Sequence, residues 1–464
     1  MQIFKKIINS QFLIGTLFYS FPSLISTIIS LVSVPIFLKY SSINLYSDYL
    51  ISHFVLTFAI LTNLNFGKIA TINIAKYRSN KKNIFYTTTL FTAIISSALT
   101  LILFYFFKIL IDIYNLENIR EISSLKILLG LLITNFFFTF EGIFKGNFNY
   151  KFLSLFNLFF YSLSLSLPSI IVILKINFDI FYFSLIIKFL IVFFMFLLCI
   201  KEYGLKDLKI SKEFVNDCIK NLKWMSLNTT LNQIYNYFDK YLIKIFLENI
   251  AFIYYSISQQ LTSKFGDPLI SYNNVFIAKT NKHRNNEKEN LSYSAIFYCI
   301  YAYIIFIILY FFLDIFLKIW LGENYSIFYL NLIKIFFLIV TIGSFSRLLV
   351  DYYDLTKNSK RISFFEIIVF IPFLAAIVFS VYQKNIYYFV YTVFLKEFFT
   401  FLLRYFYIKK LFFFEFFTGI QILLLIVNSI LWFFEININI GLIIQATHII
   451  IFAPFKKLRR FYNI

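Results

Sequence analysis

Residues 221–282 read NLKWMSLNTTLNQIYNYFDKYLIKIFLENIAFIYYSISQQLTSKFGDPLISYNNVFIAKTNK. This stretch predicts two long apolar helices joined by a tight turn near Glu248 and Asn249. At about 100° per residue, one face of the first helix collects polar side chains, namely Asn228, Asn232, Tyr235, Asn236 and Asp239, with Lys240 at its edge. Because such groups are costly in hydrocarbon, we expect this face to look into protein or into a water-filled cavity.

The second helix of this stretch repeats the arrangement. Its polar face is expected to hold Tyr255, Ser258, Gln259, Thr262 and Gly266. Two adjacent helices with aligned polar faces suggest the wall of a transport pathway through a membrane.

The composition of the whole chain is that of a polytopic membrane protein. Hydrophobic residues make up 60% of the 464 residues, aromatic residues 22%, and the mean hydropathy is +0.78, whereas soluble domains are roughly half apolar. Only 14% of the residues are charged, yet the formal net charge is +20. We therefore expect the basic residues in loops and at helix ends, and we expect no nucleic-acid partner.

Cofactor and metal chemistry find little support in the sequence. Cys199, Cys218 and Cys299 form no CxxC pair, so they predict neither a disulfide framework nor a metal site. The three histidines are scattered singly along the chain. We expect no cofactor and no bound metal.

Apolar windows long enough to cross a bilayer recur along the chain. We predict an all-α fold with about fourteen transmembrane helices. The windows lie near residues 12–38, 46–68, 84–107, 123–144, 152–174, 179–200, 221–247, 250–277, 291–313, 327–353, 362–382, 386–408, 412–434 and 437–454. The last two windows could instead form a re-entrant hairpin, which leaves twelve spans as the alternative.

The loops between these windows alternate in charge. Basic residues are several times more numerous in the loops after even-numbered spans, for example Lys81 and Lys82, than in the other loops. We count Arg404, Lys409 and Lys410 among these loop residues. Since basic loops stay in the cytoplasm, both termini are expected to be cytoplasmic. No hydrophilic stretch is long enough for a soluble nucleotide-binding or catalytic domain.

A short internal repeat divides the chain. Ile74-Ala75-Lys76 at the end of the second window matches Ile277-Ala278-Lys279 at the end of the eighth. Six spans per repeat predict two lobes in the same orientation with a central cavity between them. We assign residues 1–210 and 211–410 to these six-helix lobes, and residues 411–464 to accessory helices with a basic tail.

Several motifs resemble those of the polysaccharide flippases in the multidrug/oligosaccharidyl-lipid/polysaccharide exporter superfamily. They include Leu64-Asn65-Phe66-Gly67, the run from Phe238 to Ile243 and the run from Ile253 to Ser256. Pro35-Ile36-Phe37 through Tyr46, Ile74-Ala75 before a basic loop, and Trp320-Leu321-Gly322 extend the resemblance over most of the chain.

The resemblance implies a function and its partners. The chain would move an undecaprenyl (polyprenyl) pyrophosphate-linked oligosaccharide, such as an O-antigen (lipopolysaccharide) or capsule repeat unit, across the inner membrane by alternating access. It would work as a monomer in the lipid bilayer, with other glycan-assembly membrane proteins as candidate partners. A cation-coupled multidrug or small-molecule antiporter of the same fold is the alternative.

Ionisable residues inside the predicted spans need a reason, because each costs about 2.5–3.5 kcal/mol on insertion scales. Lys188, Asp239, Lys240 and Arg347 are the candidates for lining the cavity beside the polar face and Tyr255 and Gln259. The alternatives are an ion pair or a snorkelling side chain for Lys240, and an intrahelical pair with Asp351 for Arg347. For His53 we favour a hydrogen-bonded buried imidazole over a proton relay.

Enzymatic and ATP-driven alternatives lack their sequence features. The chain has no GxxxxGK[ST] motif. It also has no large external loop of the kind that a membrane glycosyltransferase would need. A cation or drug antiporter would need carboxylates deep in the first six spans, where Glu141 lies near an end. We therefore expect a transporter rather than an enzyme.

Overall fold

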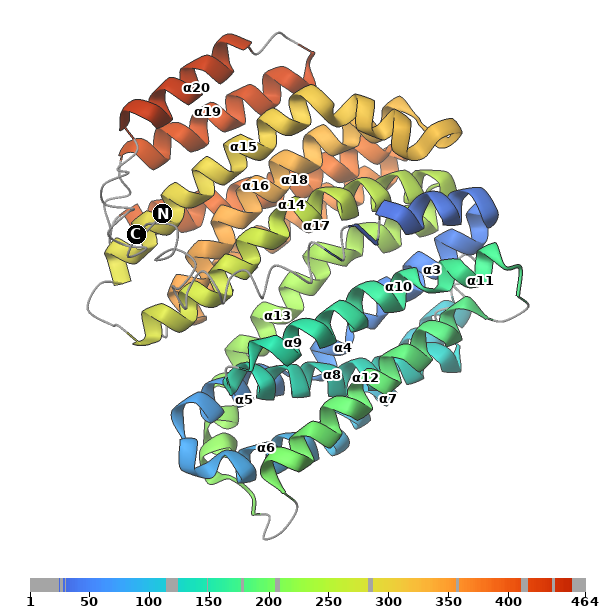
Figure 1. Ribbon diagram of the computed structural model, residues 1–464, viewed down its shortest axis with the longest axis vertical. Coiled ribbons are helices and arrows are strands. Elements are labelled where there is room, and N and C mark those ends of the chain that lie inside the picture. Colours follow the sequence, from blue (N-terminus) through green and yellow to red (C-terminus); the bar gives the residue numbers. More distant parts are fainter. Residues whose placement is uncertain are drawn as a thin grey trace, which may run out of the picture. The chain divides into compact units, whose positions relative to one another are not determined.

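The computed structural model describes residues 25, 28, 29, 31–113, 124–147, 149–176, 179–204, 209–282, 287–355, 359–409, 416–435 and 439–452. Within these ranges every regular element is a helix, as the sequence predicted. The contacts divide the chain into two compact units (Figure 1). We call residues Leu24–Ile253 the amino-terminal unit, and the described residues from Tyr254 onward the carboxyl-terminal unit. The two six-helix lobes and the accessory segment predicted above stay a prediction.

The amino-terminal unit is built from short and long helices. They include α3 (Ile43–Leu56), α4 (Ala59–Thr62), α5 (Phe66–Lys76), α6 (Lys81–Phe91), α7 (Ser97–Ile113), α8 (Leu125–Gly146), α9 (Tyr150–Asn157), α10 (Ser164–Ser166), α11 (Pro168–Ile173), α12 (Ile180–Tyr203) and α13 (Lys212–Phe246). Two π-helical segments, η2 (Thr92–Ser96) and η4 (Leu158–Leu163), connect α6 to α7 and α9 to α10.

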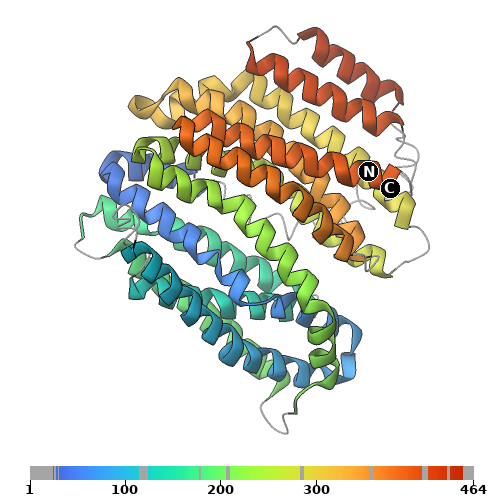
Figure 2. The same cartoon turned by 180° about the vertical axis from the view of Figure 1, so that it is seen from behind.

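The carboxyl-terminal unit contains longer and more regular helices. They are α14 (Asn249–Lys282), whose first turn still belongs to the amino-terminal unit, α15 (Glu287–Leu321), α16 (Ile327–Leu355), α17 (Ser359–Gln383), α18 (Ile386–Lys409), α19 (Phe416–Phe433) and α20 (Asn439–Phe452). Helices α17 and α18 lie side by side, as do α19 and α20 (Figure 2).

Eight helices of the described chain are long and apolar enough to cross a membrane. They confirm a multi-pass membrane protein, whereas the number fourteen stays a prediction. The windows predicted at 46–68 and 152–174 are not single helices, because α3, α4 and α5 follow one another in the first, and α9, η4, α10 and α11 in the second. The window at 12–38 lies largely outside the described residues.

The break within residues 46–68 has a local cause. Leu64 and Asn65 adopt left-handed backbone conformations, with φ of 51° and 60°, which an α-helix of L-residues excludes. The side chain of the preceding Asn63 fastens this break to α8, because its Nδ2 donates to the Asn135 carbonyl at 3.1 Å. Its Oδ1 accepts from the Gly67 amide at 3.4 Å. Buried hydrogen bonds thereby offset part of the cost of interrupting a helix within an apolar window.

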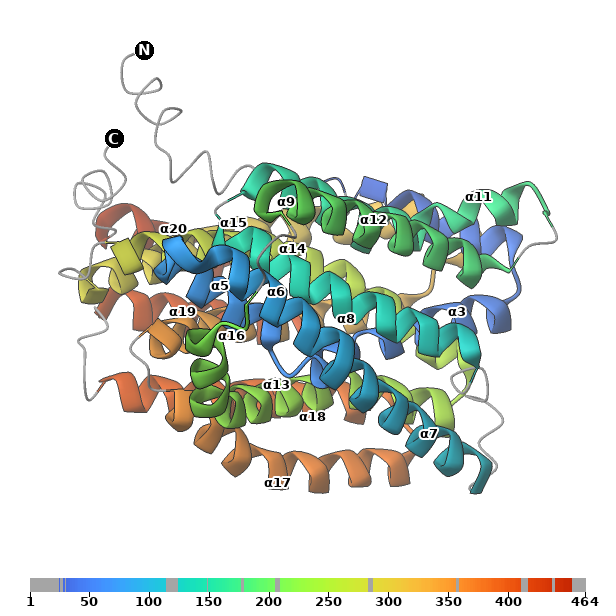
Figure 3. The same ribbon diagram turned by 90° about the horizontal axis from the view of Figure 1, so that it is seen from below.

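Glycines set how closely α5 and α8 approach within the amino-terminal unit (Figure 3). A Cβ atom added to Gly142 would lie 2.0 Å from the Gly67 carbonyl oxygen, and one added to Gly67 would lie 2.2 Å from the Phe138 carbonyl oxygen. Thr71 Oγ1 donates to the Gly142 carbonyl at 2.8 Å across the same contact. Small residues at such a crossing let two backbones touch, which is how helices associate in membranes.

The position of Arg404 corrects the sequence analysis. We counted Arg404 among the basic loop residues, but it lies inside α18 and is 5% exposed. Its guanidinium pairs with Glu366 of α17, which is fully buried, and its Nη1 donates to Ser346 Oγ of α16 at 2.5 Å. The charge of Arg404 therefore belongs to a contact between helices, and it gives no information on which side of the membrane the following loop lies.

Candidate functional site

Helix α13 begins with a defined cap outside its apolar part. Ser211 Oγ accepts from the Phe214 amide at 3.3 Å, as an N-cap serine does. Hydrogen bonds from the backbone amide of Glu213, from Ser211 and from Asn80 lower the pKa of the Glu213 carboxyl group. This ionised carboxylate in the first turn suits the helix dipole.

The predicted turn between the two organising helices is confirmed. α13 ends at Phe246 and α14 begins at Asn249, so only Leu247 and Glu248 lie between them. Within the amino-terminal unit, α13 packs on α3, α4, α5 and α6. Thr229 Oγ1 donates to Asn65 Oδ1 at 3.0 Å, which ties α13 to the break between α4 and α5.

The predicted polar face of α13 separates into two rows. Asn228 and Asn232 are half-buried, Asn236 is exposed, and Asn232 Nδ2 donates to Asn228 Oδ1 at 3.4 Å. Tyr235 and Asp239 belong to the other row, and both are buried, at 1% and 0% exposure. The asparagine row is therefore the more exposed part of the face, and Lys240 follows Asn236 one turn further along the helix.

Lys240 is buried at 4% exposure among aromatic rings. Its Nζ lies 4.3 Å from the centroid of the Tyr237 ring and 4.9 Å from that of Phe54, and it donates to the Asn236 carbonyl. Asp239 Oδ1 accepts from the backbone amide of Lys240 at 2.8 Å. Within the described residues, no carboxylate oxygen lies within 4.0 Å of Lys240 Nζ. Aromatic faces and a carbonyl hold this ammonium while leaving its charge unpaired by a carboxylate.

Lys244 is a buried cation that the sequence analysis did not select. It lies one turn beyond Lys240 and is 2% exposed. Its Nζ donates to Ser47 Oγ at 2.7 Å, Asp48 Oδ1 at 2.9 Å and Asn249 Oδ1 at 2.6 Å. Three acceptors satisfy the three donors of an ammonium group. The four-residue spacing from Lys240 was the signal that could have indicated it.

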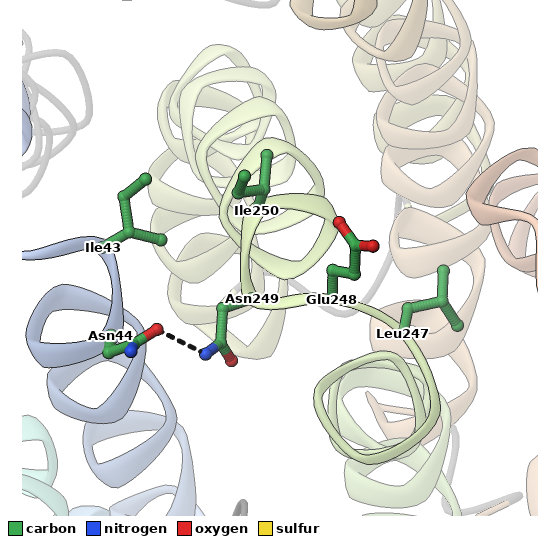
Figure 4. Close-up of a pocket in the computed structure, with 6 residues that line it drawn as sticks. All are labelled: Ile43, Asn44, Leu247, Glu248, Asn249 and Ile250. Atoms are coloured by element: carbon green, nitrogen blue, oxygen red, sulfur yellow. Dashed lines mark hydrogen bonds between the residues drawn. The ribbon is translucent and has the colours of Figure 1, made fainter.

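An open hollow of about 420 Å³ adjoins this Lys244 network (Figure 4). It is lined by Ile43 and Asn44 of α3 and by Leu247, Glu248, Asn249 and Ile250 of the turn into α14. Asn249 Nδ2 donates to Asn44 Oδ1 at 2.7 Å at its edge. The network thus fixes the turn that follows α13 to the start of α3.

Lys188 lies on α12, away from the α13 face, and its exposure is 5%. Its Nζ is 3.4 Å from His53 Nδ1 of α3 and 5.1 Å from the centroid of the Phe160 ring. The structure therefore groups Lys188 with His53 and does not join it to Lys240 by a recorded contact.

The remaining predicted site residues lie in the carboxyl-terminal unit. Tyr255 is fully buried and its ring meets that of Phe336 edge-on at 5.0 Å. Gln259, one turn further along α14, is half-buried, and Arg347 on α16 is exposed. The side chain of Asp351, the partner expected for Arg347, lies outside the described residues. That these ten residues line a pathway stays a prediction.

No protein-family model matches this sequence, and no curated protein matches it. Solved structures do resemble the fold. An outward-facing multidrug resistance MATE family transporter of the MOP superfamily has 14% identity and a TM-score of 0.61, with 89% of this chain and 96% of that chain covered. A MOP superfamily transporter from Pyrococcus furiosus, described by the reverse polarity of its binding pocket, has 13% identity and a TM-score of 0.61, with 85% and 95% covered.

The lipid II flippase MurJ in an inward closed conformation is also similar, with 15% identity and a TM-score of 0.64 over 96% of this chain and 98% of that chain. At such low identities these likenesses show the fold alone. The chain thus has the fold of MOP superfamily transporters, a fold shared by a multidrug resistance MATE family transporter and by the lipid II flippase MurJ.

Proposed function

We propose that this chain is a flippase that moves an undecaprenyl pyrophosphate-linked oligosaccharide from the cytoplasmic to the outer leaflet of the inner membrane by alternating access. The proposal is supported by the sequence resemblance to polysaccharide flippases and by a fold that the lipid II flippase MurJ shares. The chain acts as a transporter and not as an enzyme. O-antigen and capsule repeat units are the substrates that the resemblance suggests.

The observation that supports the proposal most is the excess of buried lysines over buried carboxylates in the amino-terminal unit. Among the described residues of the amino-terminal unit, Lys188, Lys240 and Lys244 are buried, whereas Asp239 is the one carboxylate residue below 9% exposure. Glu141, the acid of the first six spans that the sequence analysis weighed for an antiporter, pairs with Lys145 at 2.9 Å. A pyrophosphate group is anionic, so a unit with more buried cations than buried carboxylates favours it over a cationic drug.

The α13 face supplies the groups that such a substrate needs. Lys240 would pair with the pyrophosphate, because its ammonium is held by exchangeable aromatic and carbonyl contacts. The amides of Asn228, Asn232 and Asn236 would hydrogen-bond sugar hydroxyls along the same row. Tyr255, Gln259 and Arg347 of the carboxyl-terminal unit are also proposed to bind the substrate.

The proposed direction of transport requires a defined topology, with both termini in the cytoplasm. We expect a cysteine at position 324 to react with a membrane-impermeant maleimide in intact cells, and a cysteine at position 80 to react only after permeabilisation. The native Cys199, Cys218 and Cys299 are buried and serve as the internal background. Labelling of position 80 but not of position 324 in intact cells would reverse the orientation.

The proposed function is tested by transport in a purified system. Proteoliposomes that contain the protein should move a fluorescent undecaprenyl pyrophosphate-linked oligosaccharide between leaflets faster than protein-free vesicles do. Undecaprenol without the pyrophosphate should move no faster than in protein-free vesicles, because it lacks the group that Lys240 binds. Equal movement of both lipids would indicate non-selective lipid scrambling and would refute the proposal.

The alternative is a cation-coupled multidrug antiporter, because the multidrug resistance MATE family transporter shares the fold to a similar degree. The Pyrococcus furiosus transporter, whose pocket is described as reversed in polarity, shares it too. Pocket charge is therefore the property of this chain that separates the two functions.

A further inference from the structure

The contact between Lys188 and His53 joins α12 to α3 in the interior of the amino-terminal unit. Lys188 Nζ lies 3.4 Å from His53 Nδ1, and the other ring nitrogen, Nε2, lies 3.4 Å from Ser184 Oγ. The rings of Tyr49 and Phe181 flank the imidazole, with centroids at 4.6 and 5.3 Å. Each polar atom of the pair thus has a neighbour that fixes its place.

The geometry limits how many protons this pair can hold. Two positive charges 3.4 Å apart repel each other strongly, and Lys188 is only 5% exposed. Within the described part of the chain, no carboxylate lies within the 4.0 Å of an ion pair from Lys188 or His53. The pair can therefore carry one positive charge, located either on the lysine with a neutral imidazole or on the imidazole with a neutral amine.

Several charged side chains on α6, α8 and α13 have hydrogen-bond or ion-pair partners other than Lys188 and His53. The phenol of Tyr49 donates to the Ser164 carbonyl at 3.4 Å, and Tyr161 of η4 is exposed. Among the charged groups of α8 and α13, Lys126 pairs with Asp179, Lys145 with Glu141 and Lys244 with Asp48. Asp239 Oδ1 accepts from the backbone amide of Lys240. At the start of α6, Lys81 donates to Asn147.

We propose that Lys188 and His53 form a binding site for a single proton inside the amino-terminal unit. When Lys188 is charged, its ammonium donates to Nδ1 and the imidazole proton lies on Nε2, facing Ser184. Loss of that one proton leaves both groups neutral, so the unit changes its charge without using a carboxylate. The site itself is independent of the substrate, whereas its use in driving transport rests on the proposed flippase function.

The site can be tested without any transport. In a His283→Asn, His448→Asn background, His53 is the last of the three histidines, and ¹⁵N-labelled histidine reports its protonation by NMR in nanodiscs. We expect a neutral imidazole with its proton on Nε2 while Lys188 is present. In Lys188→Met, His53 should become cationic at a pH at least about one unit higher than in the protein that retains Lys188.

The variant Lys188→Arg is the matched control, because arginine keeps a permanent charge. It should hold His53 neutral as lysine does. If His53 instead becomes cationic at the same pH in the presence of Lys188, in Lys188→Arg and in Lys188→Met, two charges coexist and the one-proton site is refuted.

Transport provides the second arm. Flipping by the wild-type protein should change its rate when a pH gradient is imposed on the proteoliposomes, and Lys188→Arg should lose that response because its charge cannot be released. An unchanged response in Lys188→Arg would overturn the coupling role. Absence of flipping in every protein, together with the expected NMR result, would refute the flippase proposal and leave the proton site standing.

Discussion

Replacing Lys240 with methionine is expected to slow flipping of the lipid-linked oligosaccharide roughly 10- to 150-fold, which corresponds to the loss of one hydrogen bond to a charged group. Lys240 is buried and lies over the rings of Tyr237 and Phe54, without a carboxylate within ion-pair distance among the described residues. The measurement is the initial rate of flipping in proteoliposomes at equal protein density. Membrane levels should be unaffected, because methionine makes the helix more apolar.

The control for this variant removes a charge from the same helix at an exposed position. Lys220 is exposed on α13, so Lys220→Met should flip at the wild-type rate. A Lys240→Met protein that flips as fast as Lys220→Met would show that the ammonium in the aromatic pocket has only a structural role.

Breaking the buried pair between Glu366 and Arg404 is expected to destabilise the carboxyl-terminal unit by about 3–5 kcal/mol, because one charge is left buried without its partner. Glu366 is fully buried, Arg404 is 5% exposed, and Ser346 of α16 completes the contact. Glu366→Leu and Arg404→Met should each lower the midpoint of unfolding in a detergent titration.

The double variant tests whether the two charges interact. Glu366→Leu with Arg404→Met removes both charges and replaces them with apolar groups of similar size, so it should recover most of the lost stability. If the effects of the two single changes simply add, the pair does not interact and the buried contact is not what holds α17 to α18.

The helices themselves could be predicted from the sequence because membrane spans need long apolar windows. The turn at Leu247 and Glu248 was also predictable, because one apolar window ends just before it and the next begins just after it. The helix break at Leu64 and Asn65 was not, because left-handed conformations at these residues depend on Asn63 bonding to α8. Such long-range bonds leave no period in the sequence.

The candidate site was predictable only in part. A helical period places Asn232, Asn236 and Asp239 on one face, but it cannot tell which row of that face is buried. Lys188 and His53 are 135 residues apart, and Lys244 meets Ser47 across 197, so neither partnership can be inferred from spacing. Arg404 was wrongly assigned to a loop because basic residues near the end of an apolar window usually lie at the membrane surface. Its buried partner, Glu366, lies on another helix and could not be identified from the sequence.

The most direct test of the central claim compares two substrates in the same proteoliposomes. One is a fluorescent undecaprenyl pyrophosphate-linked oligosaccharide, whose arrival in the outer leaflet is read by an impermeant quencher. The other is a cationic dye, whose movement is followed under imposed Na⁺ and pH gradients. The flippase account predicts protein-dependent movement of the lipid-linked oligosaccharide, slowed in Lys240→Met, with no protein-dependent movement of the dye. Movement of the dye driven by either gradient, with the lipid-linked oligosaccharide unmoved, would contradict it.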